Sequence, residues 1–333
     1  MRYTRLGSTG PRISVVGLGF WQAGSRLWGG RNKSVRDRVR EIVVKAVEHG
    51  VNFFDTAEIY GGGLSEKILG GAVRDAGVRS EVIVASKVAG YRWRPGDIVK
   101  AVEKINRRLG FKVDLIQHHW PPPMYASICS VVRGLEETVE QGLASYYGLS
   151  NYNAELLQKA LECTKKTEPV SNQVQYNLAY RVVENRLKPL MEDRGMTLIA
   201  WSPLAKGALA GLRKPRTAAQ RTDKIFRAAA QDDDLQRVLG ELSNKYGVSR
   251  AVIALAWLVS KKAVPIPGTL KPKRVEEYAA AGTLELGQDD VRLLDETSSK
   301  YVYRWGRCYG SLRLNRYVPG LLLKLGIILM GGI

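Results

Sequence analysis

The feature that most constrains the fold is a regular alternation of short apolar runs with longer amphipathic segments. The first unit shows the pattern: Ser34 is a candidate helix N-cap, apolar residues recur at helical spacing as far as Val47, and Gly50 ends the segment. A buried strand is then expected at residues 51–54. Similar apolar runs occur at residues 15–18, 82–85, 113–116, 146–149, 173–176, 198–200 and 263–266. The alternation is typical of βα units arranged around a parallel sheet.

Eight strands with helices between them predict an α/β protein built as a closed (β/α)8 barrel, the TIM-barrel fold. An open doubly wound sheet gives a similar alternation, so the strand count does not separate the two. The placement of polar residues favours the barrel, because in a parallel barrel the strand ends meet on one face that carries the site. Just beyond the ends of different runs lie Asp55, Lys87, His119, Ser150 with Asn151, Trp201 with Ser202, and Gly268 with Thr269.

The chain of 333 residues is 45% hydrophobic and has no linker-like stretch, which predicts one domain over residues 1–333. Two segments depart from the βα pattern. Residues 211–231 form a long connection, predicted to be a lid, a binding loop or a mobile segment. Residues 318–333 form an apolar tail that is too short to span a bilayer, which needs about 20 residues. We expect this tail to pack on the protein or on a second subunit, with contact to a membrane surface as the alternative.

Charge and cysteine content exclude several classes of function. Lys and Arg total 51 against 32 Asp and Glu, a formal charge of +19, but the basic residues are spread along the chain. This pattern predicts a basic surface without specific nucleic-acid binding. Cys129, Cys163 and Cys308 have no CxxC spacing, so we expect neither a metal site nor a disulfide. The N-terminal residues are polar and do not resemble a signal peptide, and we expect a cytoplasmic protein.

Four polar residues supply groups that the reduction of a carbonyl needs. Such a reaction requires a hydride source and an acid that protonates the developing alkoxide. Tyr60 is a weak acid at its ordinary pKa of about 10, but a neighbouring Lys87 ammonium would favour the phenolate and lower that pKa. Asp55 could keep Lys87 charged and in position, and His119 could donate a hydrogen bond to the substrate oxygen. Each residue taken alone also fits an ordinary role in capping, packing or solvation.

Three motifs resemble those of the aldo-keto reductase superfamily. They are Phe53-Phe54-Asp55-Thr56-Ala57-Glu58-Ile59-Tyr60-Gly61 followed by Ser65-Glu66, Asp114-Leu115-Ile116-Gln117-His118-His119-Trp120-Pro121, and Ala85-Ser86-Lys87. The resemblance implies the barrel fold and a catalytic set of Asp55, Tyr60, Lys87 and His119. His119 is chosen over His118 because it directly precedes Trp120. Residues 17–21 and 28–30 are similar to the branch that includes potassium-channel β subunits and related bacterial and archaeal reductases.

The resemblance also implies a nicotinamide dinucleotide. NADP(H) is expected rather than NAD(H), because Lys271, Lys273 and Arg274 are candidates to hold a 2′-phosphate. Tyr278 stands where the family usually has an asparagine at the adenine. No GxGxxG follows a strand into a helix, as a Rossmann dehydrogenase would require. The full set of expected cofactor-binding residues is Gly19, Trp21, Ser150, Asn151, Gln173, Trp201, Ser202, Pro203, Leu204, Lys206, Gly207, Gly268, Thr269, Lys271, Arg274, Glu277 and Tyr278.

Aromatic residues in loops on the expected catalytic face predict an apolar substrate pocket formed by Trp28, Tyr91, Trp93 and Trp120. The sequence therefore predicts an NADP(H)-dependent oxidoreductase that reduces aldehydes or ketones to alcohols, with Tyr60 as the general acid and small carbonyl compounds or alcohols as partners. The alternative is a regulatory subunit that binds the cofactor, senses redox state and has weak reductase activity.

Overall fold

The structure is a computed structural model that describes residues 1–24, 34–305, 317, 318, 322, 324 and 325. Within these residues, eight parallel strands form one sheet in the order β10-β9-β8-β7-β6-β5-β4-β3. The strands are β3 (Leu18–Gly19), β4 (Phe53–Asp55), β5 (Ile83–Val88), β6 (Val113–His118), β7 (Ala144–Ser150), β8 (Ser171–Gln175), β9 (Thr197–Trp201) and β10 (Ala263–Pro265). The predicted strands are present with small shifts at their ends.

The two edges of the sheet meet at a seam formed by two glycines. Gly19 pairs with Gly268 in a parallel bridge, and the Gly19 amide donates to the Pro267 carbonyl at 3.1 Å. A Cβ added to Gly268 would lie 3.0 Å from the Gly19 oxygen, so the close approach of the two strands depends on glycine, which has no side chain. The seam completes the barrel that the sequence predicted, and this prediction is confirmed.

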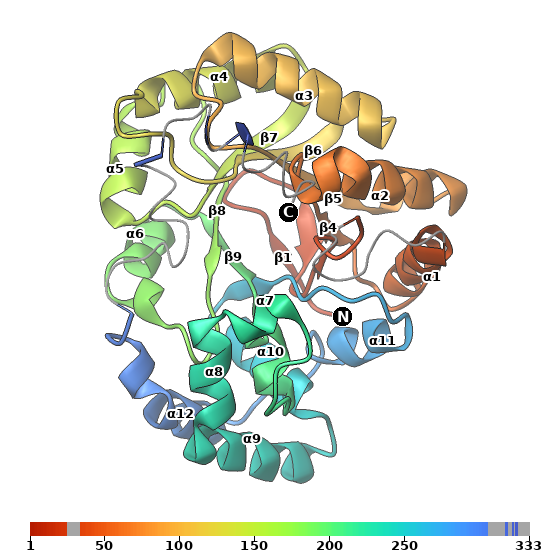
Figure 1. The fold of residues 1–333 in the computed structure, drawn as a ribbon, viewed down its shortest axis with the longest axis vertical. Coiled ribbons are helices and arrows are strands. Elements are labelled where there is room, and N and C mark those ends of the chain that lie inside the picture. The colour runs from red at the N-terminus through yellow and green to blue at the C-terminus, as the bar shows by residue number, and fades with distance from the viewer. Residues whose placement is uncertain (25–33, 306–316, 319–321, 323, 326–333) are drawn as a thin grey trace.

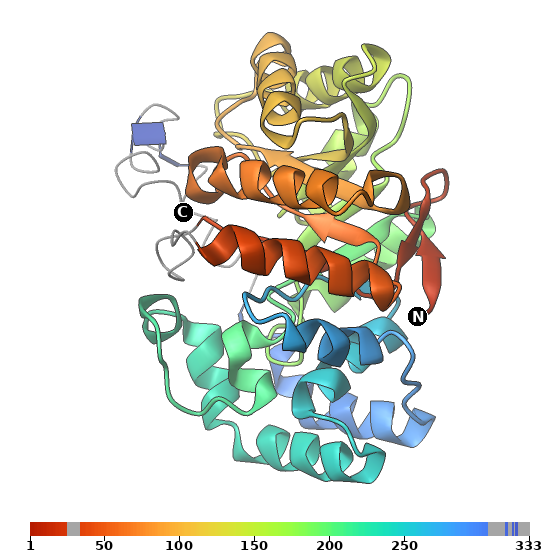
Figure 2. The same ribbon diagram turned by 90° about the vertical axis from the view of Figure 1, so that its right-hand side faces the viewer.

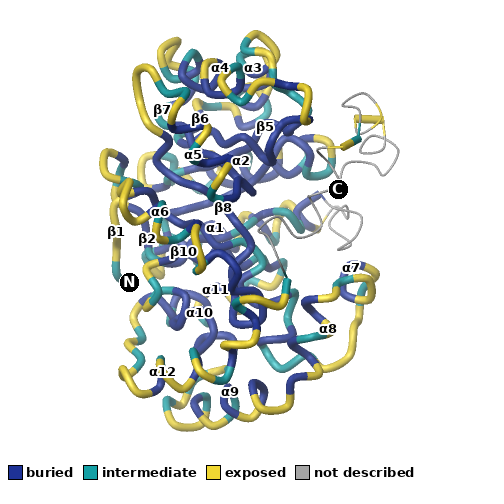
Figure 3. Tube along the Cα trace, turned by 90° about the vertical axis from the view of Figure 1, so that its left-hand side faces the viewer, coloured by how far each residue is buried: buried dark blue, intermediate teal, exposed yellow. Residues whose placement is uncertain are grey.

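Helices surround the strands, as Figure 1 shows. Several begin at side-chain caps: Ser127, Asn153 and Ser249 each accept a hydrogen bond from a backbone amide in the first turn. Helix α3 ends at Gly110, which has a positive φ of 79°. The helices that follow successive strands are α1 (Ser34–Glu48), α2 (Leu64–Asp75), α3 (Pro95–Leu109), α4 (Ile128–Glu140), α5 (Ala154–Glu162), α6 (Leu187–Asp193), α10 (Arg250–Ser260) and α11 (Lys273–Ala280). Figure 3 shows the buried backbone in the barrel and the exposed backbone on its outer helices.

Further elements lie outside the repeated pattern. A hairpin of β1 (Tyr3–Arg5) and β2 (Arg12–Ser14) lies at the end of the molecule opposite α7, as Figures 2 and 3 show. Its buried Leu6 and Ile13 pack with Phe53 from inside the barrel. The remaining elements are α9 (Asp233–Tyr246), α12 (Gln288–Thr297) and the 3₁₀ turns η2 (Tyr60–Gly63), η3 (Arg79–Glu81), η4 (Val182–Glu184), η5 (Ala205–Ala210) and η6 (Ser299–Tyr301).

The long connection at residues 211–231 is not one structureless loop. It contains two helices, α7 (Ala218–Arg221) and α8 (Lys224–Gln231). Thr217 and Gln220 form a capping box at the start of α7, and Asp223 caps α8 by accepting from two backbone amides. The many basic residues obscure the helical pattern of this segment in the sequence. The capping residues Thr217 and Asp223, which begin the two helices, are nevertheless present.

A disulfide joins Cys129 in the first turn of α4 to Cys163 at the C-terminal end of α5. The expectation of no disulfide is therefore wrong for this pair. The two residues are 34 positions apart in sequence, and only the neighbouring placement of α4 and α5 brings them together. Cys308 and Trp28 lie outside the described residues.

Replacing Cys129 and Cys163 together with serine is expected to lower the free energy of unfolding by about 3–4 kcal/mol, because the cross-link restricts a loop of this length in the unfolded chain. Urea unfolding with and without a reducing agent measures the effect. The wild type should lose stability in the reducing agent, whereas the double variant should not respond. Identical unfolding curves for the wild type in both conditions, with free thiols at Cys129 and Cys163 by mass spectrometry, would contradict the expectation.

Among the described residues, no helix is long and apolar enough to cross a membrane. The structure describes four residues of the apolar tail, namely Val318, Leu322, Lys324 and Leu325. Val318 and Leu322 line the cavity at the mouth of the barrel.

Candidate active site

A cavity of about 1260 Å³ opens at the carboxyl ends of the strands. Most of the residues that the sequence assigned to the site meet there. They are Gly19, Trp21, Asp55, Tyr60, His119, Trp120, Ser150, Asn151, Gln173, Trp201, Ser202, Pro203, Leu204, Lys206, Gly207, Gly268, Arg274 and Tyr278. The strand ends therefore converge as the barrel interpretation required.

Asp55, Lys87 and Tyr60 form a hydrogen-bonded chain from the barrel interior to the cavity. The Lys87 ammonium is completely buried and lies 2.5 Å from Asp55 Oδ1, 2.9 Å from the Thr56 carbonyl oxygen and 3.4 Å from Tyr60 Oη. Asp55 ends β4, Lys87 lies in β5, and Tyr60 begins the turn that leads into α2. Lys87 does not line the cavity, whereas its partners Tyr60 and Asp55 do.

Burial and neighbouring charges together set the ionisation of Tyr60 and Lys87. Burial raises the pKa of Tyr60, and the opposing effect of Lys87 is smaller and is partly cancelled by Asp55, so the phenol keeps its proton. The predicted net lowering of this pKa is therefore wrong, although the direction of the Lys87 effect is right. Burial also disfavours the charge on Lys87, but Asp55 and Tyr60 outweigh it, and the pKa of Lys87 lies above its ordinary value. The site thus holds a neutral phenol beside an ammonium.

The two adjacent histidines have different environments. His118 is buried, with Nδ1 2.8 Å from the Tyr152 hydroxyl and Nε2 3.0 Å from the Arg92 carbonyl oxygen, and burial lowers its pKa to about 4. His119 lines the cavity with its ring 5.6 Å from the Tyr60 ring. Burial, and then the positive charge of Lys87, lower the pKa of His119 well below its ordinary value. His119 Nδ1 has no hydrogen-bond partner among the described residues. This geometry agrees with choosing His119, as a neutral imidazole, over His118.

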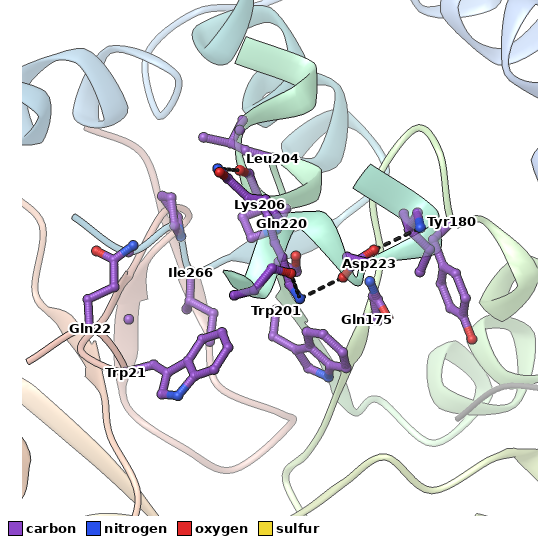
Figure 4. A pocket seen from close by; sticks show the side chains of 18 of the residues that line it. Trp21, Gln22, Gln175, Tyr180, Trp201, Leu204, Lys206, Gln220, Asp223 and Ile266 are labelled. Atoms are coloured by element: carbon purple, nitrogen blue, oxygen red, sulfur yellow. Dashed lines mark hydrogen bonds and ion pairs between the residues drawn. The ribbon is translucent and has the colours of Figure 1, made fainter. Parts of the chain in front are cut away.

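Trp201 and a set of amide and hydroxyl groups line the cavity beside Tyr60 and His119. The Trp201 indole donates to Asn151 Oδ1 at 2.9 Å, and Asn151 Nδ2 donates to the His119 carbonyl at 2.8 Å. Ser150 donates to the Gln173 carbonyl at 2.9 Å. Figure 4 shows Trp201 between Trp21 on one side and Gln175 and Tyr180 on the other. The Trp201 ring and the polar groups are thus fixed by hydrogen bonds between the ends of several strands.

Unusual backbone conformations gather at the same mouth. Asn151, Ser202, Ala205 and Lys206 are non-glycine residues with φ between 45° and 62°. Such conformations cost about 1–3 kcal/mol each and are concentrated at functional sites. They turn the chain sharply after β7 and β9, where the cavity begins.

The segment that contains α7 and α8 forms one wall of the cavity. Lys206 Nζ lies 2.7 Å from Asp223 Oδ2 and donates to the Ala219 carbonyl at 3.0 Å. In return, Gln220 Nε2 donates to the Lys206 carbonyl at 2.8 Å. Lys206 therefore holds the segment against the turn that follows β9 (Figure 4).

The start of α11 forms another part of the wall. Arg274 and Tyr278 line the cavity, and an Arg274 guanidinium nitrogen donates to the Tyr278 hydroxyl at 3.3 Å. Four residues that the sequence assigned to the cofactor, namely Thr269, Lys271, Lys273 and Glu277, do not line the cavity. The Thr269 hydroxyl accepts from the Lys271 amide at 2.9 Å, Lys271 is exposed, and Glu277 accepts from Ser249 at 2.5 Å.

The substrate side differs most from the sequence interpretation. Trp120 lines the cavity, but Tyr91 and Trp93 do not: Tyr91 contacts Trp120 edge-on, and Trp93 contacts Tyr125. Sequence reasoning missed several lining residues, among them Gln22, Ile59, Gln175, Tyr180, Arg216, Gln220, Asp223, Ile266, Trp305, Val318 and Leu322. Tyr180 and Trp305 stack although they are far apart in sequence, and no local pattern could have paired them.

The comparisons with known proteins agree with this geometry. The model of the Aldo/keto reductase family matches residues 15–299. An uncharacterized oxidoreductase of Mycobacterium tuberculosis is 34% identical over 308 residues, which cover 90% of this chain and 94% of that protein. A probable voltage-gated potassium channel subunit beta of Arabidopsis thaliana is 30% identical over 306 residues, which cover 84% of this chain and 91% of that protein.

Solved structures show the same fold. A thermostable aldo-keto reductase in complex with the inhibitor epalrestat matches with a TM-score of 0.76 and 30% identity, over 89% of this chain and 100% of that chain. An aldo-keto reductase from Klebsiella pneumoniae in complex with NADPH matches with a TM-score of 0.74 and 26% identity, over 89% of this chain and 95% of that chain. Because the family model covers most of the chain and these relatives match nearly their whole length, the chain belongs to the aldo/keto reductase family.

Proposed function

We propose that this oxidoreductase uses NADP(H) to reduce aldehydes and ketones to alcohols, with Tyr60 as the general acid. The observation that carries the proposal is that the Tyr60 hydroxyl, backed by buried Lys87, lines the same cavity as His119, Trp201 and the Asn151 amide. A protonated phenol and a neutral imidazole thus lie beside a flat aromatic surface with polar groups at its edge.

The cavity fits a nicotinamide dinucleotide. Its volume of about 1260 Å³ exceeds the roughly 300–1,000 Å³ of most small-molecule sites. Trp201 offers a ring face for the nicotinamide, and Ser150, Asn151 and Gln173 offer donors and acceptors for its carboxamide. Arg274 offers positive charge for the phosphates, whereas the ammonium of Lys206 is paired with Asp223. When bound there, the reduced cofactor would supply the hydride.

Each residue of the site has a role in the proposed reaction. His119, as a neutral ring, donates a hydrogen bond to the carbonyl oxygen and orients the substrate. As negative charge develops on that oxygen, the Tyr60 hydroxyl transfers its proton to it, while the carbonyl carbon accepts the hydride. The Lys87 ammonium stabilises the phenolate that remains, and Asp55 holds Lys87 in place. Reprotonation of Tyr60 completes the cycle.

The proposed substrates are apolar or aromatic carbonyl compounds. The cavity is lined by Trp21, Ile59 and Trp120 close to Tyr60 and His119, and also by Tyr180 and Trp305. Such a surface stabilises a ring or an alkyl chain by burial. We place the protein in the cytoplasm, where NADPH is available.

The test is to mix the purified protein with NADPH and a panel of aldehydes and ketones and to follow NADPH oxidation. Quenching of protein fluorescence, to which Trp201 should contribute, reports binding in the same samples. Turnover that requires Tyr60 supports the proposal. Binding without turnover would favour a regulatory subunit that senses redox state, a role suggested by the similarity to channel β subunits. If the protein shows no binding and no turnover, both functions are ruled out.

Arg274→Met is expected to weaken NADPH binding about 10- to 100-fold, because a hydrogen bond to a charged group contributes about 1.5–3 kcal/mol. NADH, which has no 2′-phosphate, should bind the variant almost as it binds the wild type. Lys271→Met serves as the comparison, since Lys271 is exposed and does not line the cavity, and its effect should be smaller. Fluorescence titration with both dinucleotides measures these changes. Equal losses for NADPH and NADH would contradict the assignment of Arg274 to the phosphate.

A further inference from the structure

The carboxylate of Asp55 is held by two glutamine amides as well as by Lys87. Its Oδ1 faces Lys87, and its Oδ2 accepts from Gln173 Nε2 at 2.7 Å and from Gln117 Nε2 at 3.3 Å. The Gln173 amide nitrogen also lies 3.4 Å from Gln117 Oε1. Both glutamines are buried, with 0% of Gln117 and 2% of Gln173 exposed. The carboxylate is thus fixed on both of its oxygens.

These side chains form one layer across the inside of the barrel. Asp55, Gln117 and Gln173 come from β4, β6 and β8, and alternate strands of a barrel contribute to the same interior layer. Two residues earlier in β4 and β6, Phe53 and Leu115 belong to the apolar cluster inside the barrel. The polar layer therefore lies directly above Phe53 and Leu115, and the small buried Ser171 is the corresponding residue of β8. A layer that served packing alone would contain apolar side chains here as well, because each buried amide must be satisfied.

The two glutamines differ in their access to the cavity. Gln173 lines it and Gln117 does not. Gln173 therefore has Asp55 on one side and the cavity on the other, whereas Gln117 contacts the carboxylate only from within the barrel. Gln117 offers a way to change the support of Asp55 without touching a molecule in the cavity.

We propose that Gln117 and Gln173 are positioning residues that hold Asp55 against Lys87 and so keep Lys87 directed at the Tyr60 hydroxyl. This inference rests on the proposed role of Tyr60. Gln173 lines the cavity and begins a continuous chain of contacts through Asp55 and Lys87 to the Tyr60 hydroxyl. A molecule bound in the cavity is thereby connected to the proposed general acid. The two amides share the negative charge of Asp55, which would otherwise act more strongly on its neighbours.

The electrostatic consequence has a definite sign. Among the described residues, the charged and titratable groups that face the Tyr60 hydroxyl are Lys87 from β5, Asp55 from β4 and neutral His119 after β6. Asp55 raises the pKa of Tyr60, and Lys87 lowers it. Removing an amide donor leaves more negative charge on Asp55, so the pKa of Tyr60 should rise further and the phenol should become a weaker acid.

Gln117→Met tests the inference, because methionine fills a similar volume and donates no hydrogen bond. The kcat for carbonyl reduction should fall about tenfold, consistent with loss of about 1.4 kcal/mol from one bond to a charged group. The Kd for NADPH should stay unchanged because Gln117 does not line the cavity. In the resting protein, the NMR signal of isotopically labelled Tyr60, assigned by its loss in Tyr60→Phe, should titrate at a higher pH than in the wild type. Gln173→Met should change the Kd and kcat together.

Gln117→Glu gives a signature that packing cannot produce. When protonated, its carboxyl group donates to Asp55 Oδ2 as the amide does, so activity relative to the wild type should recover as the pH is lowered. When ionised, it places a second negative charge beside Asp55, and activity should fall below that of Gln117→Met. This variant also keeps the test decisive if Gln117→Met does not fold.

Gln236→Met is the matched control, since Gln236 is a buried glutamine whose amide donates to the Ala208 and Ala229 carbonyls outside this layer. It should lower Tm without moving the titration of Tyr60. If Gln117→Met lowers only Tm and keeps the wild-type kcat and Tyr60 titration, Gln117 merely fills the barrel and the inference is wrong. If the wild type binds NADPH but reduces no carbonyl, the proposed function fails separately, and the Tyr60 titration still decides the role of Gln117.

Discussion

Tyr60→Phe is expected to lower kcat for carbonyl reduction about 10²- to 10⁴-fold while the Kd for NADPH stays near its wild-type value. The variant removes one oxygen, and with it the proposed proton donor, and general acids contribute a factor of about this size. Lys87 and Asp55 keep their ion pair in the variant, so folding should be little affected. Rapid mixing of the enzyme with NADPH and an aldehyde measures the chemical step, and fluorescence titration measures binding.

Tyr147→Phe is the control for removing a buried hydroxyl. Tyr147 donates to the Thr167 carbonyl at 2.5 Å and lies outside the cavity, so its loss should affect stability and leave kcat at the wild-type value. A Tyr60→Phe enzyme that retained full kcat would show that another group, or solvent, supplies the proton. In that case the role of Lys87 in supporting the acid would also have to be abandoned.

Lys87→Met is expected to remove most activity and to lower the free energy of unfolding by about 3–5 kcal/mol, because it leaves the buried Asp55 carboxylate without its cation. The stability loss is large because both groups are almost fully buried, at 0% and 3% side-chain exposure. Urea unfolding at neutral pH measures it. The double variant Asp55→Asn/Lys87→Met removes the unpaired charge and should regain much of the stability without regaining activity.

That pair of variants separates two roles of the ion pair. If the double variant is no more stable than Lys87→Met, then the destabilisation comes from lost packing around the Lys87 side chain, not from the unpaired carboxylate. If Lys87→Met keeps wild-type kcat, the ammonium does not support the acid. Stability and activity therefore test the electrostatic argument independently.

The meeting of Asp55, Lys87 and His119 at one cavity mouth could be predicted because each of them closely follows an apolar run. A strand end in a parallel barrel points to the mouth, so Asp55, Lys87 and His119 could be placed together from the sequence alone. The ionisation of Tyr60 could not, because it depends on a balance between burial and the Lys87 charge. Burial of an individual side chain is a tertiary quantity that local sequence does not give.

The other differences have the same origin. The disulfide depends on the adjacency of α4 and α5, and the stacked pair of Tyr180 and Trp305 depends on a segment after α12 returning to the mouth. The hairpin strands β1 and β2 have three residues each, too few for a periodic signal. Gln117 was not singled out, although it directly follows the predicted run at residues 113–116, because a polar side chain at the end of a strand gives no sign of what it contacts. Local patterns located the elements, and long-range contacts determined the partners.

The barrel is closed between β3 and the segment after β10 by the pairing of Gly19 with Gly268, so its stability against opening depends on this seam. The last edge of the sheet is closed by very short strands, and the cavity lies across it, with Gly19 and Trp21 on one side and Gly268 and Arg274 on the other. A molecule that spans the seam contacts both edge strands of the sheet. Binding of that molecule therefore raises the free energy needed to separate the two edge strands. Saturation with dinucleotide should accordingly protect the amides of residues near Gly19 and Gly268 from hydrogen exchange more than those of the opposite wall.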